Sequence, residues 1–157
     1  MKKKIISLLS ALALTAQIVP CALADNDVKV YVNDTEMITD APIIIENDCT
    51  LVPVRAISEY LDYNVDWDGD AQKVTISKNE TTLTFTIGNS VMECSTIYQG
   101  NPIPLPKILE ATPKLINDTT YIPLSDVTTA FELNITWDAD NKEIHIDKYE
   151  KGYLTLL

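Results

Sequence analysis

The amino-acid sequence predicts an α+β fold, a twisted antiparallel β-sheet with two short helices, built from two similar β-α-β-β units. Three observations predict it. Residues 47–78 align without a gap on residues 117–148, at a constant offset of 70. Each segment contains an apolar i, i+3, i+7 spacing, and each ends in two alternating runs rich in Val, Ile, Thr and Trp. We place the units at about 28–88 and 91–148, within one domain of residues 25–157.

Each unit begins with an Asn-Asp turn and a short apolar strand, residues 50–52 or 120–122, that stops at a proline. Pro53 and Pro123 fit the first turn of a helix, where the missing N–H is not needed. The helices expected after them are short and amphipathic, so they must lie on an apolar surface. Their apolar faces consist of Val54, Ile57 and Leu61 in the first unit and of Leu124, Val127 and Phe131 in the second.

Two alternating strands follow each helix, and four polar residues join them as a hairpin. The hairpin strands are residues 64–68 with 73–77, and residues 134–138 with 143–147. Residues 82–87 extend the sheet, while residues 28–32 and the turn Asn33-Asp34 start another hairpin. Residues 100–107, which contain three prolines, read as an extended, irregular connection between the units.

The tryptophans recur at matching strand positions, as Trp67 and Trp137. Together with Pro53 and Pro123 they are expected to form the structural core of the two units. The alternative is an exposed aromatic platform for a glycan or a peptide, which would also draw on Tyr60, Tyr63, Tyr98 and Tyr121.

Three aspartates at alternate positions, Asp66, Asp68 and Asp70, suggest the start of a calcium loop. An EF-hand loop also needs glycine at position 6 and glutamate at position 12. Counted from Asp66, these positions hold Ala71 and Ser77. We therefore interpret the aspartates as hairpin-turn residues that satisfy their own backbone, and we expect no metal site.

Residues 1–24 have the layout of a secretory signal peptide, with three lysines, an apolar run and an Ala22-Leu23-Ala24 end. The apolar run is shorter than the ~20 residues that cross a bilayer, so no membrane insertion is expected after cleavage. Removal of residues 1–24 takes away three of 12 basic residues and none of 23 acidic ones, which leaves a charge of 9 − 23 = −14. Such a chain repels nucleic acid.

Two cysteines, Cys49 and Cys94, lie outside the signal peptide. Export permits a disulfide between them, and two separate thiols are the alternative. The chain's one histidine, His145, lies in a predicted strand and is expected at the surface or at a sheet edge. No nucleophilic triad or phosphate-binding glycine motif is present, so we expect no enzymatic activity.

The pattern of strand, V-P-[VL], helix, V-x-W-D and lysine-bearing strand, given twice, resembles the copper amine oxidase N-terminal domain family, also called the stalk domain. LVPVRAISEYLDYNVDWDGDAQKVTI matches closely; the second unit carries Ser125 where family members usually have arginine, as Arg55 does here. Asp62 and Glu132 stand at the helix ends in place of the family's typical glycine. The resemblance implies exported or wall-associated proteins of Gram-positive bacteria. It implies no copper chemistry, which needs three histidine ligands.

These observations predict a non-catalytic, exported interaction or spacer module, secreted or associated with the cell surface, without a cofactor. Its partner would be a cell-envelope protein or glycan. The alternative is a small secreted protein that binds a wall glycan or a peptide through an aromatic and proline-rich patch of Tyr98, Pro102, Pro104 and Leu105. Tryptophans exposed on one face would favour the glycan-binding alternative, and two buried tryptophans would favour the spacer.

Overall fold

The strands form three sheets in the computed structural model, which describes residues 28–148. The terminal sheet has the order β13-β14-β1-β2, and the central sheet has the order β11-β12-β4-β3. The large sheet has the order β10-β8-β7-β6-β5, with β9 paired to β8. The prediction of one twisted sheet is therefore wrong, although two short helices are present as expected. The signal peptide predicted at residues 1–24 lies outside the described residues.

The terminal sheet consists of β1 (Lys29–Val32), β2 (Thr35–Glu36), β13 (Leu133–Asp138) and β14 (Glu143–Lys148). The central sheet consists of β3 (Ile44–Glu46), β4 (Cys49–Pro53), β11 (Lys114–Ile116) and β12 (Thr119–Pro123). The large sheet consists of β5 (Asn64–Asp68), β6 (Lys73–Lys78), β7 (Thr81–Thr86), β8 (Val91–Tyr98), β9 (Asn101–Pro104) and β10 (Lys107–Ile108). The helices are α1 (Val54–Leu61) and α2 (Leu124–Ala130).

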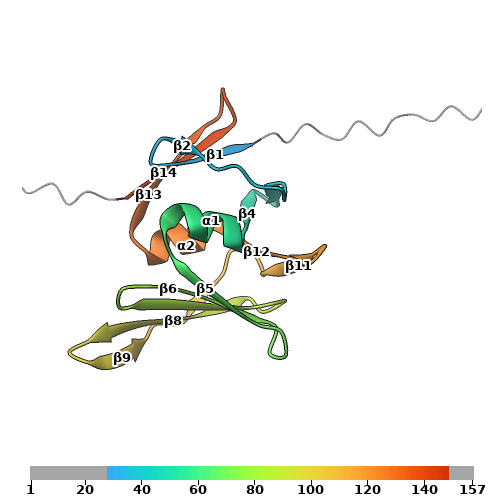
Figure 1. Ribbon diagram of the computed structural model, residues 1–157. Helices are drawn as coiled ribbons and strands as arrows, with labels where there is room; N and C mark the ends of the chain where they lie inside the picture. Colours follow the sequence, from blue (N-terminus) through green and yellow to red (C-terminus); the bar gives the residue numbers. More distant parts are fainter. Residues whose placement is uncertain (1–27, 149–157) are drawn as a thin grey trace, which may run out of the picture.

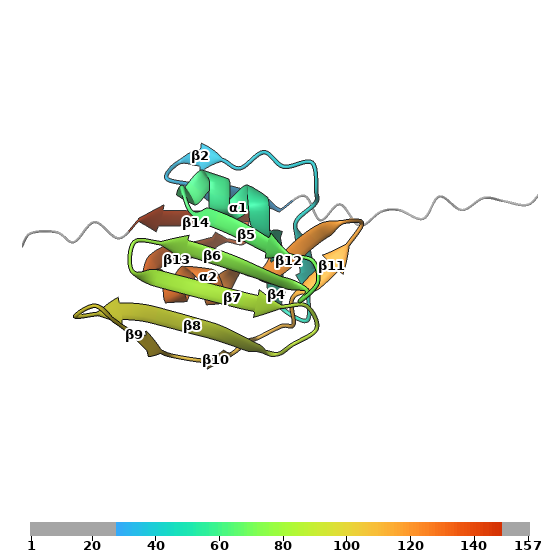
Figure 2. The same cartoon turned by 60° about the horizontal axis from the view of Figure 1, so that its bottom comes forward.

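Both helices lie between the terminal sheet and the large sheet (Figure 1). The turned view shows β5 to β8 as one layer in front of the helices (Figure 2). Apolar side chains of the three sheets and both helices meet in one main core. Strands β6, β7 and β14 bury alternate side chains, whereas β4 and β12 bury consecutive ones, of which Leu51 and Tyr121 pack in a second cluster. The fully buried large side chains include Phe85, Leu51, Ile57, Leu61, Ile76, Leu83, Ile122 and Ile146.

The central sheet joins the two halves of the chain, because β4 and β12 pair antiparallel in its middle. Each of these strands runs directly into a helix, with Pro53 (φ −61°) and Pro123 (φ −65°) as the last extended residues. Proline supports this change of direction because its φ suits both conformations and its missing N–H is not needed at the helix start. Both prolines are buried.

Neither helix needs glycine for its left-handed end. Asp62 directly follows α1 with φ 60° and ψ 49°, and Glu132 lies one residue further beyond α2, after Phe131, with φ 55°. The Lys78 ammonium group donates a 2.9 Å hydrogen bond to the Leu61 carbonyl, which satisfies an acceptor at the end of α1. The left-handed stop is thus kept at both positions despite the steric cost of a side chain there.

Two further segments differ from the expectation. Residues 100–107 are not an irregular connection, since Asn101–Pro104 form a hairpin with β8 and Lys107 pairs with Met92 of the same strand. The first described strand, β1, pairs in parallel with β14. Within residues 28–148, neither helix is long and apolar enough to cross a membrane.

Candidate functional site

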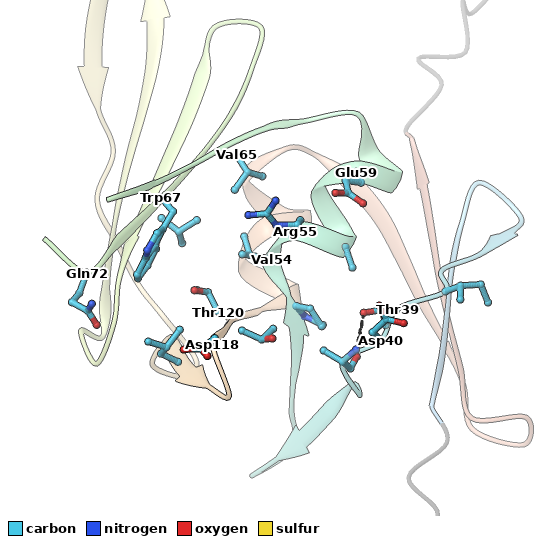
Figure 3. Close-up of a pocket in the computed structure, with 17 residues that line it drawn as sticks. Thr39, Asp40, Val54, Arg55, Glu59, Val65, Trp67, Gln72, Asp118 and Thr120 are labelled. Carbon is cyan, nitrogen blue, oxygen red and sulfur yellow. Dashed lines mark hydrogen bonds between the residues drawn. The ribbon is translucent and has the colours of Figure 1, made fainter. Parts of the chain in front are cut away.

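A groove of about 600 Å³ opens between the large sheet, the central sheet and the first turn of α1. We call it the β5 groove. Its sides come from β5, from β11 and β12, and from the segment after β2. Figure 3 shows Trp67 on one side, Thr39 and Asp40 on the other, and Val54 with Thr120 between them.

Trp67 lines the β5 groove with an aromatic side chain and is 39% exposed. It lies on β5, which is an edge strand of the large sheet within residues 28–148. Trp137 is 51% exposed on β13, the edge strand of the terminal sheet. The prediction that both tryptophans are core residues is therefore wrong; of the four repeated positions, only Pro53 and Pro123 are buried.

Among the described residues, Arg55 supplies the one basic side chain that lines the β5 groove. It is exposed, and within residues 28–148 its guanidinium group makes neither an ion pair nor a hydrogen bond. In Figure 3 it extends from α1 toward the β5 side of the groove. Three carboxylates, Asp40, Glu59 and Asp118, also line the groove, so its side chains carry a net negative charge.

A second groove of about 350 Å³ lies beside β13, and we call it the β13 groove. Trp137 again supplies the aromatic surface, and Asp48 is the only charged residue that residues 28–148 contribute to the lining. The groove is otherwise mostly apolar. Its lining consists of Ile45, Asp48, Thr50, Ile135, Thr136, Trp137 and Ile144.

The aspartates of the hairpin turns act on their own backbone. The Asp68 carboxylate accepts hydrogen bonds from the N–H groups of Asp70 (3.0 Å) and Ala71 (2.9 Å). Asp138 accepts equivalent bonds, and hydrogen bonds from Asn141 lower the pKa of the Asp138 carboxyl group. The interpretation of Asp68 as a turn residue is confirmed. The described residues contain no group of three or more His, Cys, Asp or Glu side chains placed to hold a metal ion.

Cys49 and Cys94 are free thiols that pack in different clusters. Cys49 is buried beside Leu51 and Tyr121, whereas Cys94 packs against the main core. Burial raises the pKa of both thiols above the usual value, which reduces the fraction present as reactive thiolate.

The predicted ligand patch lies on the hairpin of β8 and β9, and all four of its residues are exposed. Tyr98 is 62% exposed and Leu105 is 53% exposed. The patch is separate from both grooves, since none of its residues lines them. His145 lies on β14, where its ring stacks on that of Tyr31 at a centroid distance of 4.9 Å.

The family profile of the copper amine oxidase N-terminal domain matches residues 31–146, which include both grooves and both helices. The chain belongs to the copper amine oxidase N-terminal domain family. This domain is a non-catalytic, stalk-like domain. A curated protein named protease inhibitor, from Brevibacillus choshinensis, is 28% identical over 135 residues, or 83% of this chain. The alignment spans 39% of that relative, so the present chain covers only about two fifths of the relative's length.

Sequence reasoning missed the residues that shape the β5 groove on the sides away from Trp67. Arg55 was noted only because Ser125 replaces it in the second unit. Asp118 was interpreted as part of a turn, which it is, with φ 60°. Its place in the groove depends on β11 and β12 lying beside β5, and no local pattern contains that information.

Proposed function

We propose that the protein is an exported, non-catalytic interaction module that binds an extended polypeptide in the β5 groove. One observation carries the proposal: two open sheet edges border this groove. β5 ends the large sheet, and β11 ends the central sheet. Val65 and Trp67 of β5 and Leu115 of β11 all line the groove.

An open sheet edge presents unpaired backbone N–H and C=O groups, and an extended peptide satisfies them by adding as a further strand. Its alternate side chains would then point toward the groove, where Trp67 offers a flat apolar surface. Aromatic side chains are frequent anchors of peptide and protein ligands, because they contribute a large contact area at little entropic cost. The exposed tryptophans favour a binding protein over a spacer.

The charges of the groove favour a basic peptide. Asp40, Glu59 and Asp118 give three negative charges against the single positive charge of Arg55. The whole chain carries a net charge of −11, so its field attracts cationic partners over a longer range. The donors of Arg55 are available to the carbonyl oxygens of a bound backbone.

The sequence of residues 1–24 supports export, to the medium or to the cell surface, where the partner would be a cell-envelope polypeptide. The relative's name agrees with a polypeptide partner, because a protease inhibitor acts by contact with another protein. Membership in a family of non-catalytic domains supports the absence of enzymatic activity.

Fluorescence tests this proposal directly, because the chain has two tryptophans and each lines one groove. In the Trp137→Phe variant, Trp67 is the one remaining tryptophan, and excitation above the tyrosine absorption band reports its emission alone. We expect its emission to change saturably with the capped peptide acetyl-Lys-Val-Lys-Val-Lys-Val-amide, but not with the Glu-for-Lys analogue. Asp118→Asn should weaken binding about threefold, as for one exposed charge pair, and added salt should weaken it further.

Asparagine at position 118 keeps the turn, because asparagine also tolerates the positive φ of that residue. A Trp67 signal that responds only to an N-acetylglucosamine hexasaccharide would indicate a glycan site and contradict the proposal. No response to any of the three probes would contradict it as well.

The hairpin of β8 and β9 is a second candidate surface, favoured by its concentration of exposed apolar side chains. Ile97, Tyr98, Ile103 and Leu105 are between 40% and 62% exposed. Tyr98→Ala distinguishes the two surfaces, since it lies outside the β5 groove. If peptide affinity falls with Tyr98→Ala and not with Trp67→Ala, the hairpin is the binding surface.

A further inference from the structure

The strand registers of the two halves of the described chain match at the 70-residue offset. In the central sheet Ile44 pairs with Leu51 and Lys114 pairs with Tyr121. The hairpins that carry the tryptophans also match, since Trp67 pairs with Val74 and Trp137 pairs with Ile144.

The pairing of β4 with β12 relates these halves by an approximate twofold axis. Val52 lies opposite Ile122, its own counterpart at the offset of 70. On the two sides of this pair, Leu51 faces Pro123 and Tyr121 faces Pro53, which exchange under the same offset. An antiparallel pair with this register has its twofold axis between Val52 and Ile122.

The same symmetry exchanges the two grooves. Six of the seven residues that line the β13 groove correspond, at an offset of 70, to residues that line the β5 groove. The corresponding pairs are Trp137 with Trp67, Asp48 with Asp118, Thr50 with Thr120, Ile45 with Leu115, Ile135 with Val65, and Ile144 with Val74. The β13 groove is likewise bordered by two edge strands, β13 and β3. Each groove therefore combines a tryptophan from one half of the chain with an aspartate from the other.

We propose that the β13 groove is a second binding site for an extended basic polypeptide, so that one chain holds two such segments. This inference rests on the proposed function of the β5 groove. The occupant follows from charge: Asp48 is the sole charged residue of the lining, and the rest is mostly apolar. A lysine or arginine side chain fits this combination, with its aliphatic stem on the Trp137 ring and its cationic end toward Asp48.

The two sites differ at one side chain that bears on specificity. Arg55 lines the β5 groove, but its counterpart Ser125 does not line the β13 groove. The Ser125 hydroxyl group instead donates a 2.8 Å hydrogen bond to the Glu110 carboxylate. The β13 groove is also smaller, at about 350 Å³ against 600 Å³. It therefore holds a shorter stretch of peptide, and no cationic side chain of the described residues lines it to repel lysine or arginine.

Two sites on one chain change what the protein does with a partner. A partner with two basic segments can occupy both grooves, and the second contact then forms at a high effective concentration. Two separate partners can instead be bridged by one chain.

The test uses Trp67→Phe in the full chain, where Trp137 is the one remaining tryptophan and is excited above the tyrosine absorption band. We expect its emission to change saturably with acetyl-Lys-Val-Lys-Val-Lys-Val-amide. On the same Trp67→Phe background, adding Asp48→Asn should weaken peptide binding about threefold, whereas adding Asp118→Asn should leave the affinity unchanged. Asp48 has φ 62°, which asparagine tolerates, so the variant keeps its turn. Calorimetry on the unaltered chain should give two peptides per chain.

The outcomes separate the two proposals. A response of Trp67 without one of Trp137, with one peptide per chain, leaves the β5 groove as a site and overturns the second. The second proposal is also overturned if Asp48→Asn leaves the peptide affinity measured from Trp137 emission unchanged. No response of either tryptophan overturns both proposals.

Discussion

The ion pair of Lys107 and Asp126 offers a sharp test of how the second half of the chain is held together. Asp126 is fully buried in the first turn of α2. The Lys107 ammonium group lies 3.0 Å from Asp126 Oδ1, and the Glu110 N–H donates a 3.2 Å hydrogen bond to Oδ2. Oδ1 accepts no hydrogen bond within the described residues, so this ion pair is its one polar contact there. Lys107 therefore compensates a carboxylate that water does not reach.

Lys107→Met should destabilise the domain by about 3 kcal/mol, because it leaves a buried carboxylate without its cation. Asp126→Ala should cost about 2 to 3 kcal/mol, since the Glu110 N–H loses its acceptor while Lys107, 41% exposed, turns to water. The corresponding positions of the first half hold Met37 and Ala56, which pack with the main core. The double variant Lys107→Met/Asp126→Ala should thus cost no more than Asp126→Ala alone, which is about 2 to 3 kcal/mol.

Urea unfolding, followed by far-ultraviolet circular dichroism, measures these differences. With a slope of about 1.5 kcal/mol per molar urea, a 3 kcal/mol loss lowers the midpoint by about 2 M. Ser125→Ala is the matched control at the neighbouring residue, and its exposed hydrogen bond to Glu110 should matter by less than about 1 kcal/mol. If the two single effects add in the double variant, the buried pair does not act as described.

Glu132→Gly should raise the free energy of unfolding by about 0.5 to 1 kcal/mol, because Glu132 has φ 55°, which glycine adopts without steric cost. The control is Thr129→Gly at an exposed position within α2, which should lower the free energy of unfolding. Equal losses of stability in the two variants, measured by urea unfolding, would contradict this reasoning. Burial raises the pKa of Tyr63 to about 12, against 10 in the unfolded chain, so the folded state keeps the proton longer. The stabilisation from the protonated Tyr63 is then fully present below pH 10 and is lost as the pH rises from 10 to 12. Absorbance at 295 nm measures the tyrosine titration, and unfolding experiments across this pH range measure the loss of stability. An ordinary tyrosine titration together with a pH-independent stability would refute the prediction. In the folded chain at pH 8, Cys49 and Cys94 should react with a thiol reagent at least about tenfold more slowly than in the chain unfolded by urea, because burial raises the pKa of both thiols. Equal rates in the folded and unfolded chains would show that the thiols are accessible.

Local chemistry made several features predictable. The Asp68 and Asp138 turns follow from side chains that hydrogen-bond their own backbone. Both helix starts follow from a proline after a short strand. These features depend on residues that are close in sequence, so a short sequence segment is enough to predict them.

Long-range pairing was not predictable in this way. β1 pairs with β14, more than a hundred residues later, and β12 pairs with β4. Strand periodicity shows which residues share a face, but it does not show which strand is the neighbour. This is why one sheet was expected and three are present. For the same reason Trp67 and Trp137 were assigned to the core, although both lie on edge strands.

Hydrogen–deuterium exchange of the full chain with and without acetyl-Lys-Val-Lys-Val-Lys-Val-amide tests the central claim most directly, because strand addition protects backbone amides. We expect slower exchange of amides in β5 and β11 at saturating peptide, with no change in β9 of the exposed hairpin. Unchanged exchange in β5 and β11, or protection confined to β8 and β9, would contradict the account of an extended peptide bound between open sheet edges.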